Sequence, residues 1–419
     1  MRIWKPEFIF IIFAFIFGVI FMFLTPPYKV PDESSHLLRA CEVADGIFYN
    51  KTPAQNVECD KYIQRQFSLI RPAEVYQVTG YPPVLYAFSS LGLNAGKFWG
   101  GAVMFYLGRI FNLLMWIALI AAAIRITPVF KYQFLFAALL PMSVYVGMSL
   151  SADAFNNAFS FLFFAYLFKL IYDKKDLERQ DYILLVLMSV LSAFTKGAIY
   201  PIFLFFFLPI KKHKYLFSFL CLGAAFALMS WWASINLPFY NPQASPDIHR
   251  YLLLHNPFDF ILLYIKALIH NCFYYIRGCI GILGLLDVRF ALHIYIITIL
   301  AFFSSFFFLP EKKVSNPQRI LSLAVLFMFL TMLHCVLYIT WTPVGTYKIS
   351  GFQGRYLISI LPFIFLIFAQ NKDYVSEKFQ KYYKILLIIF IFLLLLYASW
   401  ILLKTYHTRW VIPILYHFL

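Results

Sequence analysis

Long apolar runs separated by short polar segments constrain this chain more than any other feature of its sequence. A helix needs about 20 mostly apolar residues to cross a bilayer, and residues 8–25, 319–340 and 383–403 approach that length. Hydrophobic residues make up 62% of the chain. Charged residues make up 13%, against about 25% in a soluble domain. The sequence therefore predicts an all-α polytopic membrane protein that forms a single membrane domain over residues 1–419.

Hydropathy predicts about eleven transmembrane helices. They lie near residues 8–25, 102–124, 132–150, 154–172, 182–196, 197–210, 215–235, 290–309, 319–340, 355–371 and 383–403. The run 182–210 is divided because Lys196-Gly197 and Pro201 interrupt it. No small-residue cleavage site follows the first apolar run, so it is expected to remain as an uncleaved signal anchor.

The positive charge of the chain, formally +16, is gathered in short clusters between apolar runs. This distribution is the positive-inside pattern, and it predicts a cytoplasmic N-terminus in an inner membrane. No nucleic-acid-binding motif or basic helix face accompanies the charge, which argues against a nucleic-acid partner. The clusters are Lys174, Lys175 and Arg179; Lys211, Lys212 and Lys214; Lys312, Lys313 and Arg319; and Lys372, Lys378, Lys381 and Lys384.

With this orientation, residues 26–100, 236–289 and 341–354 become loops on the periplasmic or extracellular side. The first is too long for a simple connection and is expected to carry amphipathic helices at the membrane surface. In the second, Asn256-Pro257 predicts a helix start, and the helix that follows is expected to lie in the interface or to re-enter the membrane.

Acidic residues directly follow the first apolar run. Asp32 and Glu33 stand at an expected helix start, and His36 and Arg39 follow one and two turns later on the same face. A carboxylate or imidazole in such a position could remove a proton from a hydroxyl group. The alternative is a helix cap with a solvated polar face, and spacing alone leaves both interpretations open.

A second polar group begins the span near 154–172. Asp153, Asn156, Asn157 and Ser160 follow the i, i+3, i+4, i+7 pattern and form one stripe on its outer half. Such a stripe faces either a polar cavity or a neighbouring helix with which it exchanges hydrogen bonds.

Isolated cations also lie near the expected outer surface. Arg109, Lys196 and Arg355 are candidates to bind a lipid phosphate, and the alternative for each is a side chain that reaches up to the interface. Arg277 and Arg289 are expected to do the latter.

Cys41 and Cys59 share the first outer loop and could form a disulfide in an oxidising compartment. No pair of cysteines or histidines has the spacing of a zinc site.

Seven short motifs in a fixed order resemble the bacterial membrane-protein family catalogued as domain of unknown function 2142, over residues 8 to about 370. The motifs are Pro31-Asp32-Glu33-x-x-His36, Tyr81-Pro82-Pro83, Gly108-Arg109-x-x-Asn112, Ser151-Ala152-Asp153-Ala154, His255-Asn256-Pro257, Gly281-x-x-Gly284-x-x-Asp287 and Gly351-x-Gln353-Gly354-Arg355-Tyr356.

That family in turn is similar to the GT-C group of glycosyltransferases, which are polytopic and carry an acidic motif in the first outer loop. The resemblance implies an inverting transfer of sugar from a polyprenyl-phosphate carrier to a glycan, glycolipid or envelope protein. Asp32 or Glu33 would be the base, and either could hold a divalent cation such as Mg²⁺ or Mn²⁺, although none is required.

We expect the remaining motif residues to bind the substrates. The expected roles are catalysis for Asp32, Glu33 and His36, donor phosphate binding for Arg355, Lys196, Arg109 and Gln353, and substrate positioning for Asp153, Asn156 and Tyr81. The alternative function is a transporter or flippase for a lipid-linked sugar, which would usually show inverted repeats and polar groups near the middle of the membrane.

Overall fold

The computed structural model describes residues 5–49, 57–67, 78, 80–173, 176–195, 200–208, 213–236, 241–309, 314–370 and 375–408. Its regular structure is almost entirely helical, as the composition predicts. Within the described residues the exception is a hairpin in which β1 (Ile282–Leu283) pairs antiparallel with β2 (Val288–Arg289).

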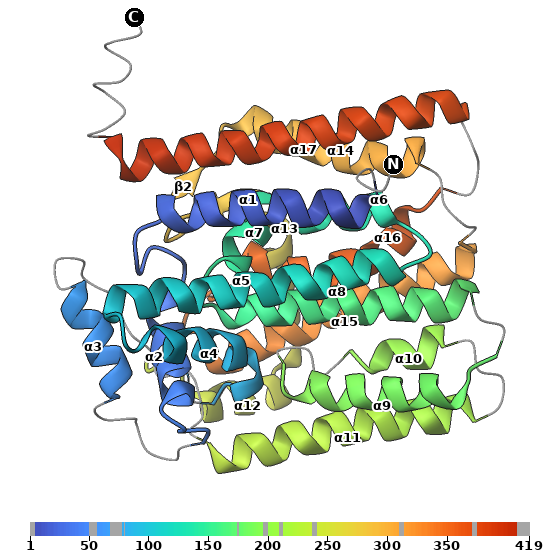
Figure 1. Ribbon diagram of the computed structural model, residues 1–419. Helices are drawn as coiled ribbons and strands as arrows, with labels where there is room; N and C mark the ends of the chain where they lie inside the picture. Colours follow the sequence, from blue (N-terminus) through green and yellow to red (C-terminus); the bar gives the residue numbers. More distant parts are fainter. Residues whose placement is uncertain are drawn as a thin grey trace, which may run out of the picture.

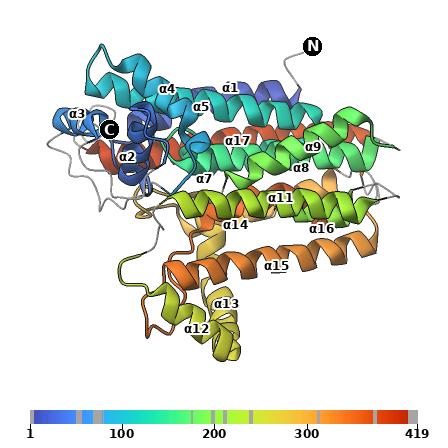
Figure 2. The same ribbon diagram turned by 90° about the horizontal axis from the view of Figure 1, so that it is seen from below.

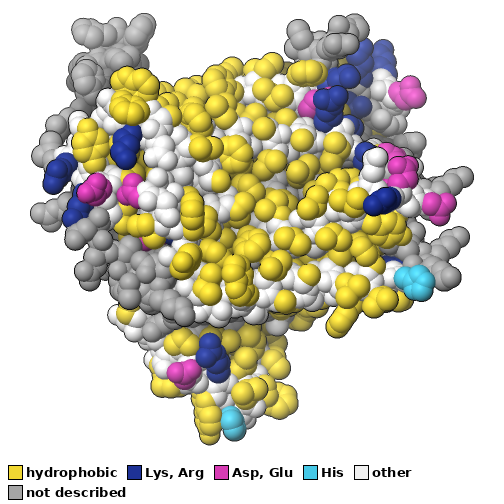
Figure 3. Space-filling model, turned by 60° about the horizontal axis from the view of Figure 1, so that its bottom comes forward, with side chains coloured by type: hydrophobic (Ala, Val, Ile, Leu, Met, Phe, Trp, Pro, Cys, Tyr) yellow, Lys and Arg dark blue, Asp and Glu magenta, His cyan; other side chains and the backbone are white. Residues whose placement is uncertain are grey.

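Six helices of the described chain are long and apolar enough to cross a membrane, and a bent pair would make a seventh. Their long axes run in a common direction (Figure 1). Figure 3 shows hydrophobic side chains across the middle of one face, with charged side chains mainly towards its two sides. The six are α1 (Pro6–Leu24), α5 (Gly101–Ile126), α8 (Ala152–Asp173), α11 (Lys214–Ile235), α15 (Asn316–Thr340) and α17 (Glu377–Tyr406).

The expected count of about eleven spans is not confirmed, because several apolar runs form broken or short helices. Proline has no backbone N–H and favours a helix start, so it divides apolar runs that hydropathy reads as continuous. The run 132–150 breaks before Pro141, and the second half of 182–210 keeps only a short helix after Pro201. The shorter helices are α6 (Lys131–Ala138), α7 (Pro141–Gly147), α9 (Arg179–Ala193), α10 (Ile202–Phe207), α14 (Leu292–Phe308), the 3₁₀ helix η2 (Gly354–Ile360) and α16 (Leu361–Phe368).

The predicted helix start at Asn256-Pro257 is confirmed, since α13 (Pro257–Gly281) begins there with Asn256 as its N-cap. It meets α12 (Pro246–His255) at an angle of 105°. Figure 2 shows α13 running across the direction of α15. This geometry fits either a re-entrant segment or a broken span.

One end of the bundle carries the short helices of the first predicted outer loop (Figure 1). A disulfide between Cys41 and Cys59, with Cα atoms 5.4 Å apart, joins the first two of them. The sequence left this pairing open, and the structure contains it. The helices are α2 (Glu33–Ala44), α3 (Glu58–Gln66), the 3₁₀ helix η1 (Pro83–Tyr86) and α4 (Ala87–Gly96).

The described basic residues of the predicted clusters lie at the opposite end, where α9, α11, α15 and α17 begin (Figure 1). Arg179, Lys214, Arg319 and Lys378 stand in the first turns of these four helices. The other members of the clusters include residues outside the described ranges. The charge pattern therefore separates the two ends of the molecule.

Burial distinguishes the inner helices from the outer ones. In α8, 83% of the most apolar window is buried, compared with 17% in α11 and 22% in α15. The polar stripe that begins α8 is thus held inside the bundle, whereas α11 and α15 present most of their surface outwards.

A close backbone approach fixes η2 against α13, and it generates a first prediction. A Cβ atom on Gly354 would lie 2.1 Å from the carbonyl oxygen of Tyr275 and 2.6 Å from the amide nitrogen of Cys279. Gly354→Ala should therefore destabilise the protein by about 1–3 kcal/mol, measured as thermal unfolding in detergent. Gly223→Ala is the control, because nothing lies within 4 Å of its added Cβ atom. Equal unfolding temperatures for the two variants would contradict this packing.

Candidate active site

The start of α2 places the two adjacent acids in different environments. Asp32 is the N-cap, with φ of 59°, a left-handed conformation that aspartate adopts more readily than most residues. Its side chain is 45% exposed. Glu33, in the first helical turn, is buried. The left-handed conformation at Asp32 thus directs the carboxylates of these two consecutive residues in different directions, Asp32 to the surface of the site and Glu33 into the protein.

Arg355 connects the exposed acid to the polar stripe of α8. Its Nη2 atom forms an ion pair with Asp32 Oδ2, and its Nη1 atom donates to the carbonyl oxygen of Pro31 at 3.3 Å. Its Nε atom lies 3.0 Å from Asp153 Oδ2, as an ion pair rather than an aligned hydrogen bond. The arginine side chain is only 1% exposed and Asp153 is 3% exposed. One buried cation therefore holds two carboxylates, and the cluster has a formal charge of −1.

Glu33 has a separate partner on α5. Arg109 Nε and Nη2 donate to its two carboxylate oxygens at 2.9 Å and 2.6 Å. Arg109 Nη1 donates to the carbonyl oxygens of Met22 and Thr25, both at 3.0 Å, at the end of α1. These carbonyls have no helical partner of their own, and the guanidinium satisfies them. The pair fastens α1, α2 and α5 together, and neither side chain lines the cavity described below.

His36 lies one turn beyond Asp32, as the spacing predicts. Its Nδ1 atom is 2.7 Å from the hydroxyl oxygen of Tyr86, and its ring stacks on Tyr81 with the centroids 6.0 Å apart. Burial raises the pKa of the Tyr86 phenol well above its ordinary value, so this hydroxyl keeps its proton at neutral pH. Arg39 donates to the Glu42 carboxylate and to the carbonyl oxygens of Tyr81, Ile47 and Phe48, and it does not line the cavity described below.

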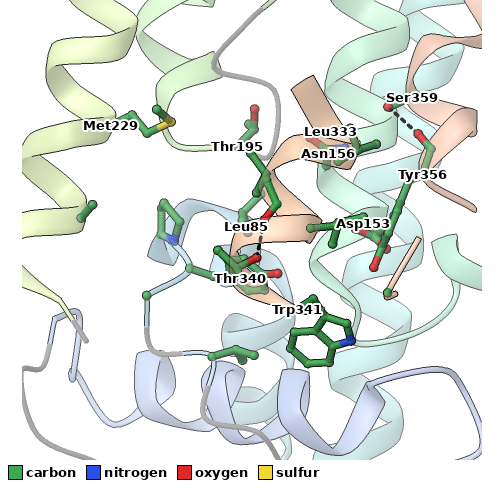
Figure 4. A pocket seen from close by; sticks show the side chains of 18 of the residues that line it. Leu85, Asp153, Asn156, Thr195, Met229, Leu333, Thr340, Trp341, Tyr356 and Ser359 are labelled. Carbon is green, nitrogen blue, oxygen red and sulfur yellow. Dashed lines mark hydrogen bonds between the residues drawn. The ribbon is translucent and has the colours of Figure 1, made fainter. Parts of the chain in front are cut away.

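A cavity of about 570 Å³ opens beside Asp32 and Asp153. Figure 4 shows Asp153 and Asn156 of α8 facing the same space as Tyr356 of η2, with Met229 of α11 on the opposite side. Its polar end is formed by α2, α8 and the loop before η2. Its apolar side comes from α11 and α15, and includes Met229, Phe329, Met332, Leu333 and Val336.

The cavity brings together most of the residues that sequence analysis selected, but not all of them. Asp32, His36, Tyr81, Asp153, Asn156 and Gln353 line it. Glu33, Arg109 and Arg355 do not line it, and Lys196 lies outside the described residues. The cations expected to meet a phosphate are therefore, where described, already bound to acids of the protein.

Several lining residues were not selected from the sequence. Trp232 at the end of α11 donates to the carbonyl oxygen of Gly80 at 2.7 Å, and it joins the first loop to the apolar side. Trp341 and Tyr356 contribute aromatic rings. Tyr356 belongs to the last of the seven motifs, and Trp341 begins the segment Trp341-Thr342-Pro343, which is typical of a turn at the membrane surface. The sequence therefore contained a pattern that could have identified these two residues. Nothing in the local pattern of α11 distinguishes Trp232.

The described residues do not form an evident metal site. No group of three or more histidine, cysteine, aspartate or glutamate side chains there could hold an ion. Asp32 and Asp153 share Arg355 instead, so the donor set does not fit the divalent cation that the sequence left optional.

Comparison with known proteins identifies the family of this chain. A family model described as a predicted membrane protein, DUF2142, matches residues 49–364. The chain belongs to this family. No curated protein and no solved structure matches the chain.

The DUF2142 match is shorter than the sequence motifs indicated, which placed its start near residue 8 and its end near 370. It includes Arg109, Asp153 and Arg355 but begins after Asp32, Glu33 and His36. Arg355 therefore lies within the matched region, whereas its partner Asp32 precedes it.

The Glu33–Arg109 pair generates the second prediction. Glu33→Gln leaves a buried guanidinium without its counter-charge, which should cost about 3–5 kcal/mol of stability. Thermal unfolding of the purified protein measures this loss. The exposed Asp247–Arg250 pair, 3.2 Å apart, supplies the control, since Asp247→Asn should change nothing measurable. A Glu33→Gln protein as stable as the control would show that the pair does not support the fold.

Proposed function

We propose that this protein is a membrane glycosyltransferase that moves a sugar from a polyprenyl-phosphate carrier to an acceptor hydroxyl. The observation that carries the proposal is the partly exposed Asp32 carboxylate at the edge of a cavity with one polar end and one long apolar side. A lipid-linked sugar has the same division, with a polar head and an apolar chain. The GT-C resemblance of the sequence motifs agrees with it.

In this proposal Asp32 is the base, and Glu33 is not. The carboxylate of Asp32 removes the proton of the acceptor hydroxyl, and the resulting oxygen attacks the anomeric carbon of the sugar. The bond from that carbon to the phosphate oxygen breaks, and polyprenyl phosphate leaves with the electron pair. Attack from the side opposite the leaving group inverts the anomeric configuration.

Arg355 has a positioning role in this scheme. Its contacts with Asp32, Asp153 and Pro31 orient the base towards the cavity, and the guanidinium itself stays behind the wall. His36, held by Tyr86 and Tyr81, would position the acceptor beside the base. Lys196 remains a proposed partner of the phosphate, because Thr195 next to it lines the cavity.

The proposed active face is the periplasmic or extracellular one. The described basic residues of the predicted clusters lie at the other end of the bundle, and positive charge favours the cytoplasmic side of an inner membrane. The Cys41–Cys59 disulfide lies at the end with the site, and disulfides persist in oxidising compartments. The acceptor would then be a glycan, glycolipid or envelope protein.

The alternative is a transporter or flippase for the lipid-linked sugar. Alternating access usually needs a polar site near the middle of the membrane. Here Asp32, Asp153 and Arg355 lie where α2, α8 and η2 begin, at one end of the long helices. This location favours transfer over transport.

The third prediction tests the reaction in cells. Cells that produce Asp32→Asn protein, and cells that lack the protein, should both accumulate the same polyprenyl-phosphate sugar on the outer leaflet. The lipid extract and its leaflet distribution are measured by mass spectrometry after labelling with an impermeant reagent. Cells with Asp247→Asn protein serve as the control and should not accumulate it. Accumulation on the inner leaflet alone would favour transport, and an unchanged pool would contradict transfer.

A further inference from the structure

We propose that Arg277 and Arg289 bind the phosphate of an anionic phospholipid on the outside of the helical bundle. Arg277 lies near the end of α13, and Arg289 lies in β2, three residues before α14 begins. Neither residue lines the cavity of the candidate active site. The inference therefore goes beyond the proposed function and does not depend on it.

A buried tyrosine connects the two segments that carry these arginines. The hydroxyl of Tyr295, in the first turn of α14, donates to the carbonyl oxygen of Gly281 at 2.9 Å and accepts from the amide of Phe290 at 3.0 Å. The guanidinium of Arg277 lies 5.9 Å from the centroid of the Tyr295 ring, and Arg289 also acts electrostatically on this phenol. Two positive charges therefore gather around one side chain.

Neither arginine has an acidic partner among the described residues. The described ion pairs involve other side chains, and Asp287, exposed in the same hairpin, forms none with Arg289. Arg277 instead contacts aromatic rings, with its guanidinium 4.9 Å from the centroid of Phe273. Its Nε atom is buried without a partner, whereas its Nη atoms, which form no hydrogen bond in the protein, are not buried. Cations in apolar surroundings require a counter-charge, and here a bound anion would supply it.

The positive-inside pattern does not account for these two arginines. The described basic residues of the predicted clusters lie at the opposite end of the bundle from β2 (Figure 1). The hairpin also packs on the last turn of α17, since a Cβ atom added to Gly284 would lie 2.8 Å from the hydroxyl oxygen of Tyr406. The pair thus lies on the side predicted to be periplasmic or extracellular, where basic residues are not favoured by topology. A local partner gives them a reason to be there.

Exposed apolar side chains adjoin both arginines. On α13, Phe273 is 41% exposed and stands one turn before Arg277. On α14, Leu292 and Ile296 are one turn apart and are 56% and 46% exposed. Because α13 and α14 contact each other, these side chains border one apolar surface. The acyl chains of a lipid whose phosphate binds the arginines would cover it.

The chemistry of the pair matches a phosphodiester in a headgroup with a net negative charge. A guanidinium presents its N–H groups in a planar fork that fits two phosphate oxygens, so two guanidiniums can hold one phosphate between them. A zwitterionic headgroup would bring its own ammonium group next to the arginines, and an anionic one avoids this repulsion. A soluble phosphate would use the arginines alone and leave the apolar surface uncovered.

Native mass spectrometry of the full-length protein in detergent tests this site. The probes are dioleoyl phosphatidylglycerol and dioleoyl phosphatidylcholine, which share their chains and phosphate and differ in headgroup charge. The dissociation constant of the first bound lipid is measured for each. We expect the protein to bind phosphatidylglycerol at least about tenfold more tightly than phosphatidylcholine.

Variants then assign the preference to the two arginines. Arg277→Gln with Arg289→Gln should reduce the tenfold preference to less than about twofold, and Arg289→Gln alone to about threefold. Arg289 is exposed, so its single variant tests the site even where the double variant does not fold. Lys266→Gln is the matched control, because it removes one exposed positive charge from α13, 11 residues before Arg277, and should leave the preference unchanged.

Equal binding of the two lipids, or an unchanged preference in Arg289→Gln and in a folded double variant, would overturn the site. An equal loss in Lys266→Gln would also overturn it, since overall charge would then explain the binding. Glycerol 3-phosphate, which carries a phosphate without acyl chains, separates the two sources of phosphate. If it binds as tightly as phosphatidylglycerol, the ligand is a soluble phosphate and the assignment to a lipid fails.

Discussion

The guanidinium of Arg355 holds together three parts of the chain that are far apart in sequence. It contacts Asp32 before α2 and Asp153 at the start of α8, from its own position at the start of η2. A buried cation requires such partners, because an uncompensated charge inside a protein is strongly destabilising. The position of the cavity follows from this cluster, since the two carboxylates that Arg355 fixes form part of its wall. The site is therefore built around a charge that does not itself reach the cavity.

The consecutive acids Asp32 and Glu33 have different partners and different exposure. Both carboxylate oxygens of Glu33 accept hydrogen bonds from Arg109, whose remaining donors bind carbonyl groups at the end of α1. This pair fastens the first helix to the start of α2, and the left-handed conformation at Asp32 then turns that side chain to the cavity. A sequence with two adjacent acids cannot reveal which one is buried, because that depends on partners 76 and 323 residues away.

The sequence predicts the helical membrane character, the separation of charge between the two ends of the molecule and several of the polar residues that line the cavity. These depend on composition, on charge clustering and on helical spacing, all of which are local. Predictions that depend on contacts between residues far apart in the sequence were less successful, and so was the predicted number of long helices. The breaks at Pro141 and Pro201 reduced the number of long helices, and Arg109 is bound to Glu33 and does not line the cavity. Trp232 was missed because its role depends on a hydrogen bond to Gly80 in another loop. The family match adds the membrane class but begins after Asp32, so the proposed base rests on geometry and on the motif alone.

The most direct test of this account is the rate of sugar transfer in isolated membranes. A radiolabelled lipid-linked sugar pool from cells lacking the protein would be mixed with membranes that contain equal amounts of wild-type or Asp32→Asn protein. Label reaching the acceptor fraction would then be counted over time. If Asp32 is the base, the variant should transfer sugar about a hundredfold or more slowly, because a positioned general base contributes at least that factor. Transfer by the variant within a few-fold of the wild-type rate would contradict the assignment of Asp32 as the catalytic base.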